Sequence, residues 1–115
     1  MLIAFTLPQI AFASHCSVEA IIRSVVDRIE ARAQDAGVHL AVDCAGGEIL
    51  ADASALSEAL FNLVANAIEA TPRGGSVSLV TRELLNGDQQ WVLRDAGHGT
   101  CMTIWLDKGF EKVSA

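Results

Sequence analysis

The sequence predicts an α+β fold in which helices pack on one face of a mixed or mostly antiparallel sheet. Two segments, 18–35 and 53–70, have helical patterns of apolar residues. Residues 38–43, 76–84 and 89–94 alternate as strands do, and Asn86-Gly87 is a strong hairpin signal between the last two. The order helix, strand, short strand, helix, hairpin favours a two-layer α/β sandwich.

Composition limits the classes of function. The chain has 115 residues, enough for one domain, with 51% hydrophobic and 19% charged residues, so a buried core is expected. The formal net charge is −6 and no basic stripe is present. Non-specific nucleic-acid binding depends on neutralising phosphates, and we therefore expect no nucleic-acid partner.

The amino terminus is apolar over Met1–Ala13 but lacks the basic residues that open a secretory signal. It is also too short to span a bilayer, and Pro8 interrupts it. We interpret residues 1–14 as the end of a preceding helix with a linker. Cys16, Cys44 and Cys101 are widely spaced, which favours a reduced cytoplasmic protein over a disulfide framework or a zinc site.

The first helix and the strand after it have clear limits. Ser17 is a plausible N-cap, and Gly37 is a natural stop. In the strand 38–43, Val38, Leu40 and Val42 alternate with polar residues, so His39 is expected on the solvent side. Ala45-Gly46-Gly47 predicts a turn, and 48–51 a short edge strand.

The second helix, with Asp52 as its expected N-cap, has a polar stripe opposite its apolar face. Glu58, Asn62 and Asn66 are four residues apart, and Glu69 follows three later. Most such stripes are solvated surfaces. Asparagine is a poor residue inside a helix, however, and its carboxamide oxygen suits Mg²⁺. The pattern alone leaves both interpretations open.

Asp95 follows the third strand directly and opens the segment Asp95-Ala96-Gly97-His98-Gly99. The glycines allow the backbone to approach a planar ligand, and the carboxylate can accept a hydrogen bond from an exocyclic amine. Ordinary turns use the same residues, so this signal is weak when taken alone.

Together these segments resemble sensor histidine kinases of the nitrogen-regulation type, within the superfamily of gyrase, heat-shock chaperone, histidine kinase and mismatch-repair ATPases. Leu60–Thr71 is similar to the N box of that family, and 95–99 to its first glycine box. Leu106–Ala115, with Phe110-Glu111, resembles the start of the phenylalanine box. Leu2–Pro8 resembles the end of the second dimerisation helix and its linker.

The resemblance implies a Bergerat ATP-binding fold, with ATP and Mg²⁺ as ligands and residues 15–115 as the amino-terminal portion of the domain. Asn66 would be the Mg²⁺ ligand and Asn62 its neighbour near the phosphates. Asp95 would bind the adenine amine, and Gly97 and Gly99 would line the base pocket. The implied partners are the histidine-bearing dimerisation domain of the same kinase and a response regulator, with a cytoplasmic location in a parent that can be membrane-anchored.

The sequence departs from the family pattern in several places. Thr100 stands where the family usually has Ile or Met, and the second glycine-rich box is absent. His15, His39 and His98 are not in phospho-acceptor contexts. We therefore expect an incomplete fold, no catalytic residue in this chain, weak nucleotide binding or none, and no autophosphorylation. A sheet that lacks strands exposes an edge, so self-association is expected too.

Two alternatives remain open. One is a degenerate non-catalytic module that uses the same fold to bind a partner protein. The other is a relative of the anti-sigma serine kinases, whose N box and glycine box would look alike.

Overall fold

The computed structural model describes residues 2–6, 14–95 and 100–106. The elements follow in the order β1 (Leu2–Thr6), β2 (Ser14–Ser17), α1 (Val18–Ala36), β3 (His39–Cys44), β4 (Glu48–Ala51), α2 (Ala53–Ala70), β5 (Ser76–Glu83), β6 (Gln89–Asp95) and β7 (Thr100–Leu106). Both predicted helices and the three predicted longer strands are present, with ends that differ from the expected ones by one residue at most.

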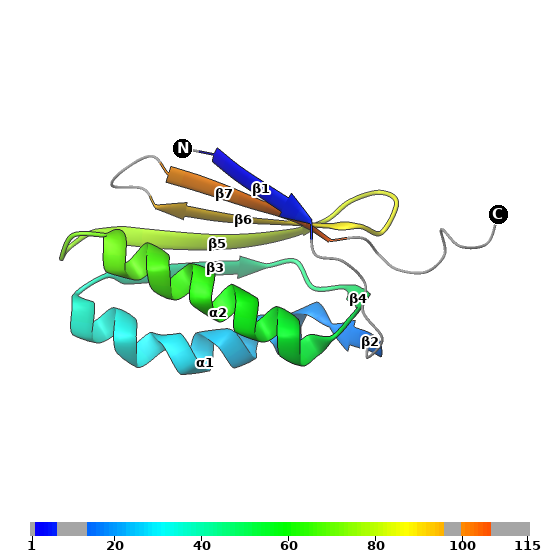
Figure 1. The fold of residues 1–115 in the computed structure, drawn as a ribbon, viewed down its shortest axis with the longest axis horizontal. Helices are drawn as coiled ribbons and strands as arrows, with labels where there is room; N and C mark the ends of the chain where they lie inside the picture. Colours follow the sequence, from blue (N-terminus) through cyan, green and yellow to red (C-terminus); the bar gives the residue numbers. More distant parts are fainter. Residues whose placement is uncertain (1, 7–13, 96–99, 107–115) are drawn as a thin grey trace.

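The strands form a mixed sheet with both helices on one face (Figure 1). The five-stranded sheet has the order β1-β7-β6-β5-β3, with parallel pairing at its two ends and antiparallel pairing in its centre. Strands β2 and β4 make a separate antiparallel pair. The predicted α+β class, with helices on one face of a mixed sheet, is confirmed.

Helix α1 has the two caps that the sequence predicts, Ser17 and Gly37. The Ser17 hydroxyl accepts the Ala20 N–H at 3.2 Å, which satisfies one of the free amides of the first turn. Gly37 ends the helix at φ +67°, a left-handed conformation that glycine adopts without steric cost. The buried stripe of α1 consists of Val18, Ile21, Ile22, Val25, Ile29 and Ala33.

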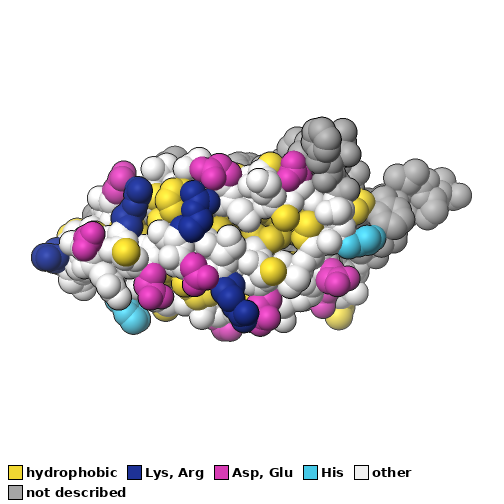
Figure 2. All heavy atoms as spheres, turned by 90° about the horizontal axis from the view of Figure 1, so that it is seen from below, with side chains coloured by type: hydrophobic (Ala, Val, Ile, Leu, Met, Phe, Trp, Pro, Cys, Tyr) yellow, Lys and Arg dark blue, Asp and Glu magenta, His cyan; other side chains and the backbone are white. Residues whose placement is uncertain are grey.

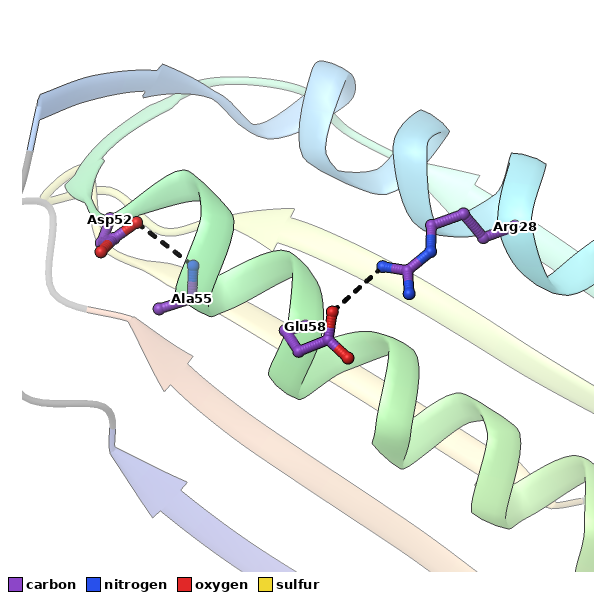
Figure 3. Close-up of polar contacts among 4 residues, drawn as sticks. All are labelled: Arg28, Asp52, Ala55 and Glu58. Carbon is purple, nitrogen blue, oxygen red and sulfur yellow. Dashed lines mark hydrogen bonds and ion pairs between the residues drawn. The ribbon is translucent and has the colours of Figure 1, made fainter.

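Helix α2 is capped by Asp52, whose carboxylate accepts the N–H group of Ala55 at 3.2 Å (Figure 3) and that of Ser54 at 3.0 Å. Thr71 closes the helix, because Pro72 disfavours helical backbone at the residue before it. The side chains that α2 buries are Leu56, Leu60, Val64, Ala65 and Ile68.

The Asn86-Gly87 turn joins β5 to β6 as predicted, with Gly87 at φ +91°. The hairpin places Trp91 at the centre of the core, where it is 0% exposed. Its indole N–H donates to Gln89 Oε1 at 3.1 Å, and Gln89 Nε2 donates to the Gly46 carbonyl at 3.2 Å. This polar link ties the turn before β4 to the central strand β6.

The helical interpretation of the amino terminus is wrong for Leu2–Thr6, which form strand β1. This segment pairs in parallel with β7, from Leu2 with Cys101 to Thr6 with Trp105. The sheet edge offers the segment backbone partners that sequence periodicity does not reveal. The predicted domain boundary after residue 14 stays a prediction.

Helices α1 and α2 meet through apolar packing with charged pairs above it. Arg28 Nη1 lies 3.3 Å from Glu58 Oε1 (Figure 3), and its guanidinium carbon lies 4.1 Å from the centre of the Phe61 ring. Arg32 and Glu69 approach to 3.8 Å. These ion pairs are exposed and contribute little to stability.

Side chains of both signs are interspersed over this face (Figure 2). No described helix is long and apolar enough to cross a bilayer.

Candidate functional site

The predicted adenine-binding carboxylate lies where the sheet meets the end of α2. Asp95 is the last residue of β6 and pairs with Val77 of β5 and Thr100 of β7. In β6, every second residue from Gln89 to Asp95 is buried, and Asp95 is only 5% exposed. Strand alternation therefore places its side chain on the same sheet face as the buried Trp91.

Asp95 is held there by Thr71, the residue that closes α2. The Thr71 hydroxyl donates to Asp95 Oδ2 at 2.9 Å, across 24 residues of sequence. It also lies 2.7 Å from the Ala67 carbonyl. A hydroxyl has one proton, so these two acceptors share one donor. The amino-acid sequence does not predict a definite role for Thr71, because no local pattern indicates a bond to a residue so distant in the chain.

The two asparagines of the N box are on the exposed surface of α2. Phe61 faces α1, where Arg28 and Arg32 lie over its ring. At about 100° per residue, Asn62 is turned about 100° and Asn66 about 140° from the direction of Phe61. Asn66 is therefore turned farther from the contact between α1 and α2, whereas Asn62 projects within about 20° of Glu69, which pairs with Arg32 of α1.

Asp95, Asn66 and Asn62 follow one another along α2. Thr71 fixes Asp95 at the carboxyl end of this helix. With a rise of 1.5 Å per residue, Asn66 lies about 7.5 Å and Asn62 about 13.5 Å from Thr71 along the axis. Along the helix axis, therefore, Asp95 lies at the carboxyl end of α2 and the two carboxamides lie toward its amino end.

Several predicted features lie outside the described residues. Gly97 and Gly99, expected to line the base pocket, belong to the segment 96–99, as does His98. Phe110-Glu111 lies in the segment 107–115. Thr100, where the sequence departs from the family, begins strand β7. Within the described residues, therefore, the candidate site consists of Asn62, Asn66, Thr71 and Asp95.

These residues are compatible with a magnesium nucleotide. Among the described residues no group of three or more His, Cys, Asp or Glu side chains could hold a metal by itself. Mg²⁺ in nucleotide sites usually takes one or two protein ligands, with phosphates and water completing the shell. The exposed Asn66 can supply one such ligand. A carboxylate has about four acceptor positions, so the bond from Thr71 does not exhaust the capacity of Asp95.

Among curated proteins, the chain is similar in sequence to histidine kinases. The chain is 36% identical over 81 residues to the signal transduction histidine-protein kinase/phosphatase MprB of Mycobacterium ulcerans. It is 35% identical over 81 residues to MprB of Mycobacterium leprae. Each match covers 70% of this chain but only 15% of the relative's length. No protein-family model matches the chain.

Solved structures agree on the fold. A mycobacterial sensor histidine kinase MprB aligns with a TM-score of 0.66 at 23% identity, covering 72% of this chain and 54% of that one. The catalytic domain of histidine kinase ThkA gives 0.65 at 20% identity, covering 70% and 57%. Full-length ShkA in complex with AMPPNP gives 0.64 at 26% identity, covering 72% and 18%. The chain therefore has the fold of a histidine-kinase catalytic domain and is similar in sequence to a segment of named histidine kinases.

Proposed function

We propose that this chain is part of the ATP-binding domain of a sensor histidine kinase, with ATP and Mg²⁺ as its ligands. The observation that carries the proposal is the bond between Thr71 and Asp95. It sets a buried carboxylate at the end of the helix that presents Asn62 and Asn66. The similarity to histidine kinases over 81 residues supports the same assignment.

Under this proposal each polar side chain has one task. Asp95 accepts a hydrogen bond from the exocyclic amine of adenine, and Thr71 holds its carboxylate in place. Asn66 gives a carboxamide oxygen to Mg²⁺, and Asn62 lies beside the phosphates. Gly97 and Gly99 line the base pocket.

When bound, ATP supplies the phosphoryl group that the parent kinase transfers to a histidine of its dimerisation domain. The residues of this chain contribute binding and orientation, which is most of what phosphoryl transfer requires from a protein. The chain spans about 15% of the length of the curated relatives that it matches. The kinase activity, the dimerisation domain and the response regulator therefore belong to the proposal for the whole protein.

We assign residues 15–115 to the ATP-binding domain. We also assign the domain to the nitrogen-regulation type of kinase, because Leu60–Thr71 resembles the N box of that type. We place the domain in the cytoplasm, since the three cysteines, Cys16, Cys44 and Cys101, are free thiols.

Calorimetric titration with AMPPNP, with and without Mg²⁺, tests this function. We expect weak saturable binding by the unmodified chain that strengthens with Mg²⁺. Asn66→Ala should abolish the effect of Mg²⁺ and leave the metal-free affinity unchanged. Asp95→Asn should weaken binding about tenfold or more under both conditions, because hydrogen bonds to a charged group contribute about 1.5–3 kcal/mol.

Glu69→Gln is the matched control, since Glu69 lies on the same helix but pairs with Arg32 of α1. This variant should bind as the unmodified chain does. Saturable binding that Asp95→Asn leaves unchanged would contradict the proposal, whereas a folded, unmodified chain that shows no saturable binding would favour the non-catalytic partner-binding module. If Mg²⁺ changed the affinity of neither the unmodified chain nor the Asn66→Ala variant, Asn66 would have no role in binding Mg²⁺.

A further inference from the structure

Strand β3 forms one end of the five-stranded sheet, and its outer edge has no strand partner among the described residues. Its inner edge pairs in parallel with β5. His39, Ala41, Val42 and Asp43 are all exposed, and Val42 is 39% exposed although it is a large apolar residue. The sequence predicts a half-buried strand here. The structure shows an edge strand that is more open than its alternation suggests.

The backbone of β3 determines which residues can accept a new strand. His39 N–H donates to the Gly75 carbonyl on the β5 side. In parallel pairing, alternate residues direct both backbone groups to the same neighbour. The backbone groups of His39, Ala41 and Asp43 therefore point toward β5, and those of Leu40 and Val42 point outward.

A groove with a mixed polar and apolar lining runs beside this edge. It has a volume of about 360 Å³ and lies between the side of α1 and strand β3. Its apolar lining consists of Val26, Ala33, Val38, Leu40 and Val42, and its polar lining of Glu30, Gln34 and His39. Leu40 and Val42 pair with the buried Val77 and Leu79 of β5, so they project on the helix side of the sheet.

We propose that two copies of this chain associate through β3, antiparallel, about a two-fold axis that passes beside Ala41. This register pairs Ala41 with its own equivalent, Leu40 with Val42 of the second copy, and His39 with Asp43 of the second copy. The two sheets become one continuous sheet. The association requires no nucleotide, so it stands or falls independently of the proposed ATP site.

Hydrogen bonding and side chains both favour this register. Leu40 and Val42 have outward backbone groups and would form hydrogen-bonded pairs. His39 and Asp43 would form non-hydrogen-bonded pairs, in which opposite side chains come closest. An imidazole thus meets a carboxylate twice by symmetry, and the exposed apolar Val42 is covered.

We infer that the partner at the free edge of β3 is a second copy of this chain, because the strand is complementary to itself. A two-fold interface uses the same patch on both subunits. Each residue of β3 must therefore be compatible with the β3 residue that lies opposite it in the second copy. Shifting the axis to Val42 would place Asp43 opposite Ala41 and leave His39 unmatched. The axis at Ala41 places both His39 opposite Asp43 and Leu40 opposite Val42.

Sedimentation velocity over a range of concentrations tests the proposal. The unmodified chain should show a monomer–dimer equilibrium. His39→Asp places carboxylates opposite each other and should weaken dimerisation about tenfold. Combining His39→Asp with Asp43→Lys places a carboxylate opposite an ammonium group and should restore the original affinity. Leu85→Asp is the control, since Leu85 is fully exposed in the β5–β6 turn and this variant should dimerise normally.

Cross-linking tests the axis directly. In a chain whose Cys44 and Cys101 are replaced by Ser, Ala41→Cys should form an intermolecular disulfide on mild oxidation, because opposite Cα atoms in such a pair lie within disulfide range. Ser78→Cys, on the neighbouring strand β5, should not. A monomer at the highest concentration overturns the proposal. So does a dimer unaffected by His39→Asp, or one that Leu85→Asp disrupts.

Discussion

Thr71 links the fold to the proposed site at the scale of a single residue. It ends α2, and its hydroxyl donates to the Asp95 carboxylate 24 residues later. Thr71 is itself buried. A buried polar group that loses its partner costs more free energy than the bond contributes on average, because desolvation is no longer compensated.

Thr71→Val keeps the shape of the side chain and removes the hydroxyl. We expect the free energy of unfolding to fall by about 1–3 kcal/mol, since a buried carboxylate loses a donor. Urea denaturation followed by circular dichroism measures this change. Thr71→Ser retains the hydroxyl and should lose less stability. Equal loss in both variants would mean that the methyl group and not the hydroxyl is responsible.

The site residues differ in how well sequence predicts them. The exposure of Asn62 and Asn66 follows from helical periodicity, because Leu60 and Val64 fix which side of α2 is buried. The position of Asp95 at a strand end follows from the alternation in β6. Its bond to Thr71 is a tertiary contact between two elements and leaves no local pattern to detect.

At the scale of elements, Asp52 shows how a cap defines a helix. Its carboxylate accepts two N–H groups of the first turn of α2 and is an anion at the positive end of the helix dipole. Helix α2 carries the asparagines, so the start of the helix also stabilises the element that presents them.

Asp52→Ala should lower the free energy of unfolding by about 1 kcal/mol, within the range of 0.5–2 kcal/mol typical of N-caps. Asp52→Asn should recover most of that loss, since asparagine caps about as well as aspartate. Urea denaturation of the unmodified chain and the two variants in parallel measures these differences in the free energy of unfolding. An Asn variant as unstable as the Ala variant would assign the stabilisation to charge alone.

Elements with local signals are predicted well, and those defined by distant partners are not. Ser17, Gly37 and Asp52 mark helix ends by their own chemistry. Strand β1 depends on a partner about 100 residues away, and neither it nor the β7 strand was predicted. Their pairing is parallel, which requires a long connection and produces no turn motif between them.

At the scale of the whole molecule, the sheet joins both ends of the described chain to the core. Strand β7 pairs with β6 along its full length, from Gln89 with Leu106 to Asp95 with Thr100. Ile104 and Leu106 are buried, and Ile104 pairs with Trp91 at the centre of the core. The edge of the sheet on this side should therefore unfold together with the core.

The two tryptophans provide a test of that cooperativity. Trp91 is buried in β6, whereas Trp105 of β7 is 41% exposed. Trp105→Phe leaves Trp91 as the only fluorophore, and Trp91→Phe leaves Trp105. In each variant, we expect the urea transition seen by fluorescence to coincide with that seen by far-ultraviolet circular dichroism, as two-state unfolding requires. Trp91→Phe should unfold at lower urea, because the buried Gln89 loses its indole donor. If Trp105 reported a transition before the loss of ellipticity, β7 would open separately, and the sheet would not be a single cooperative unit.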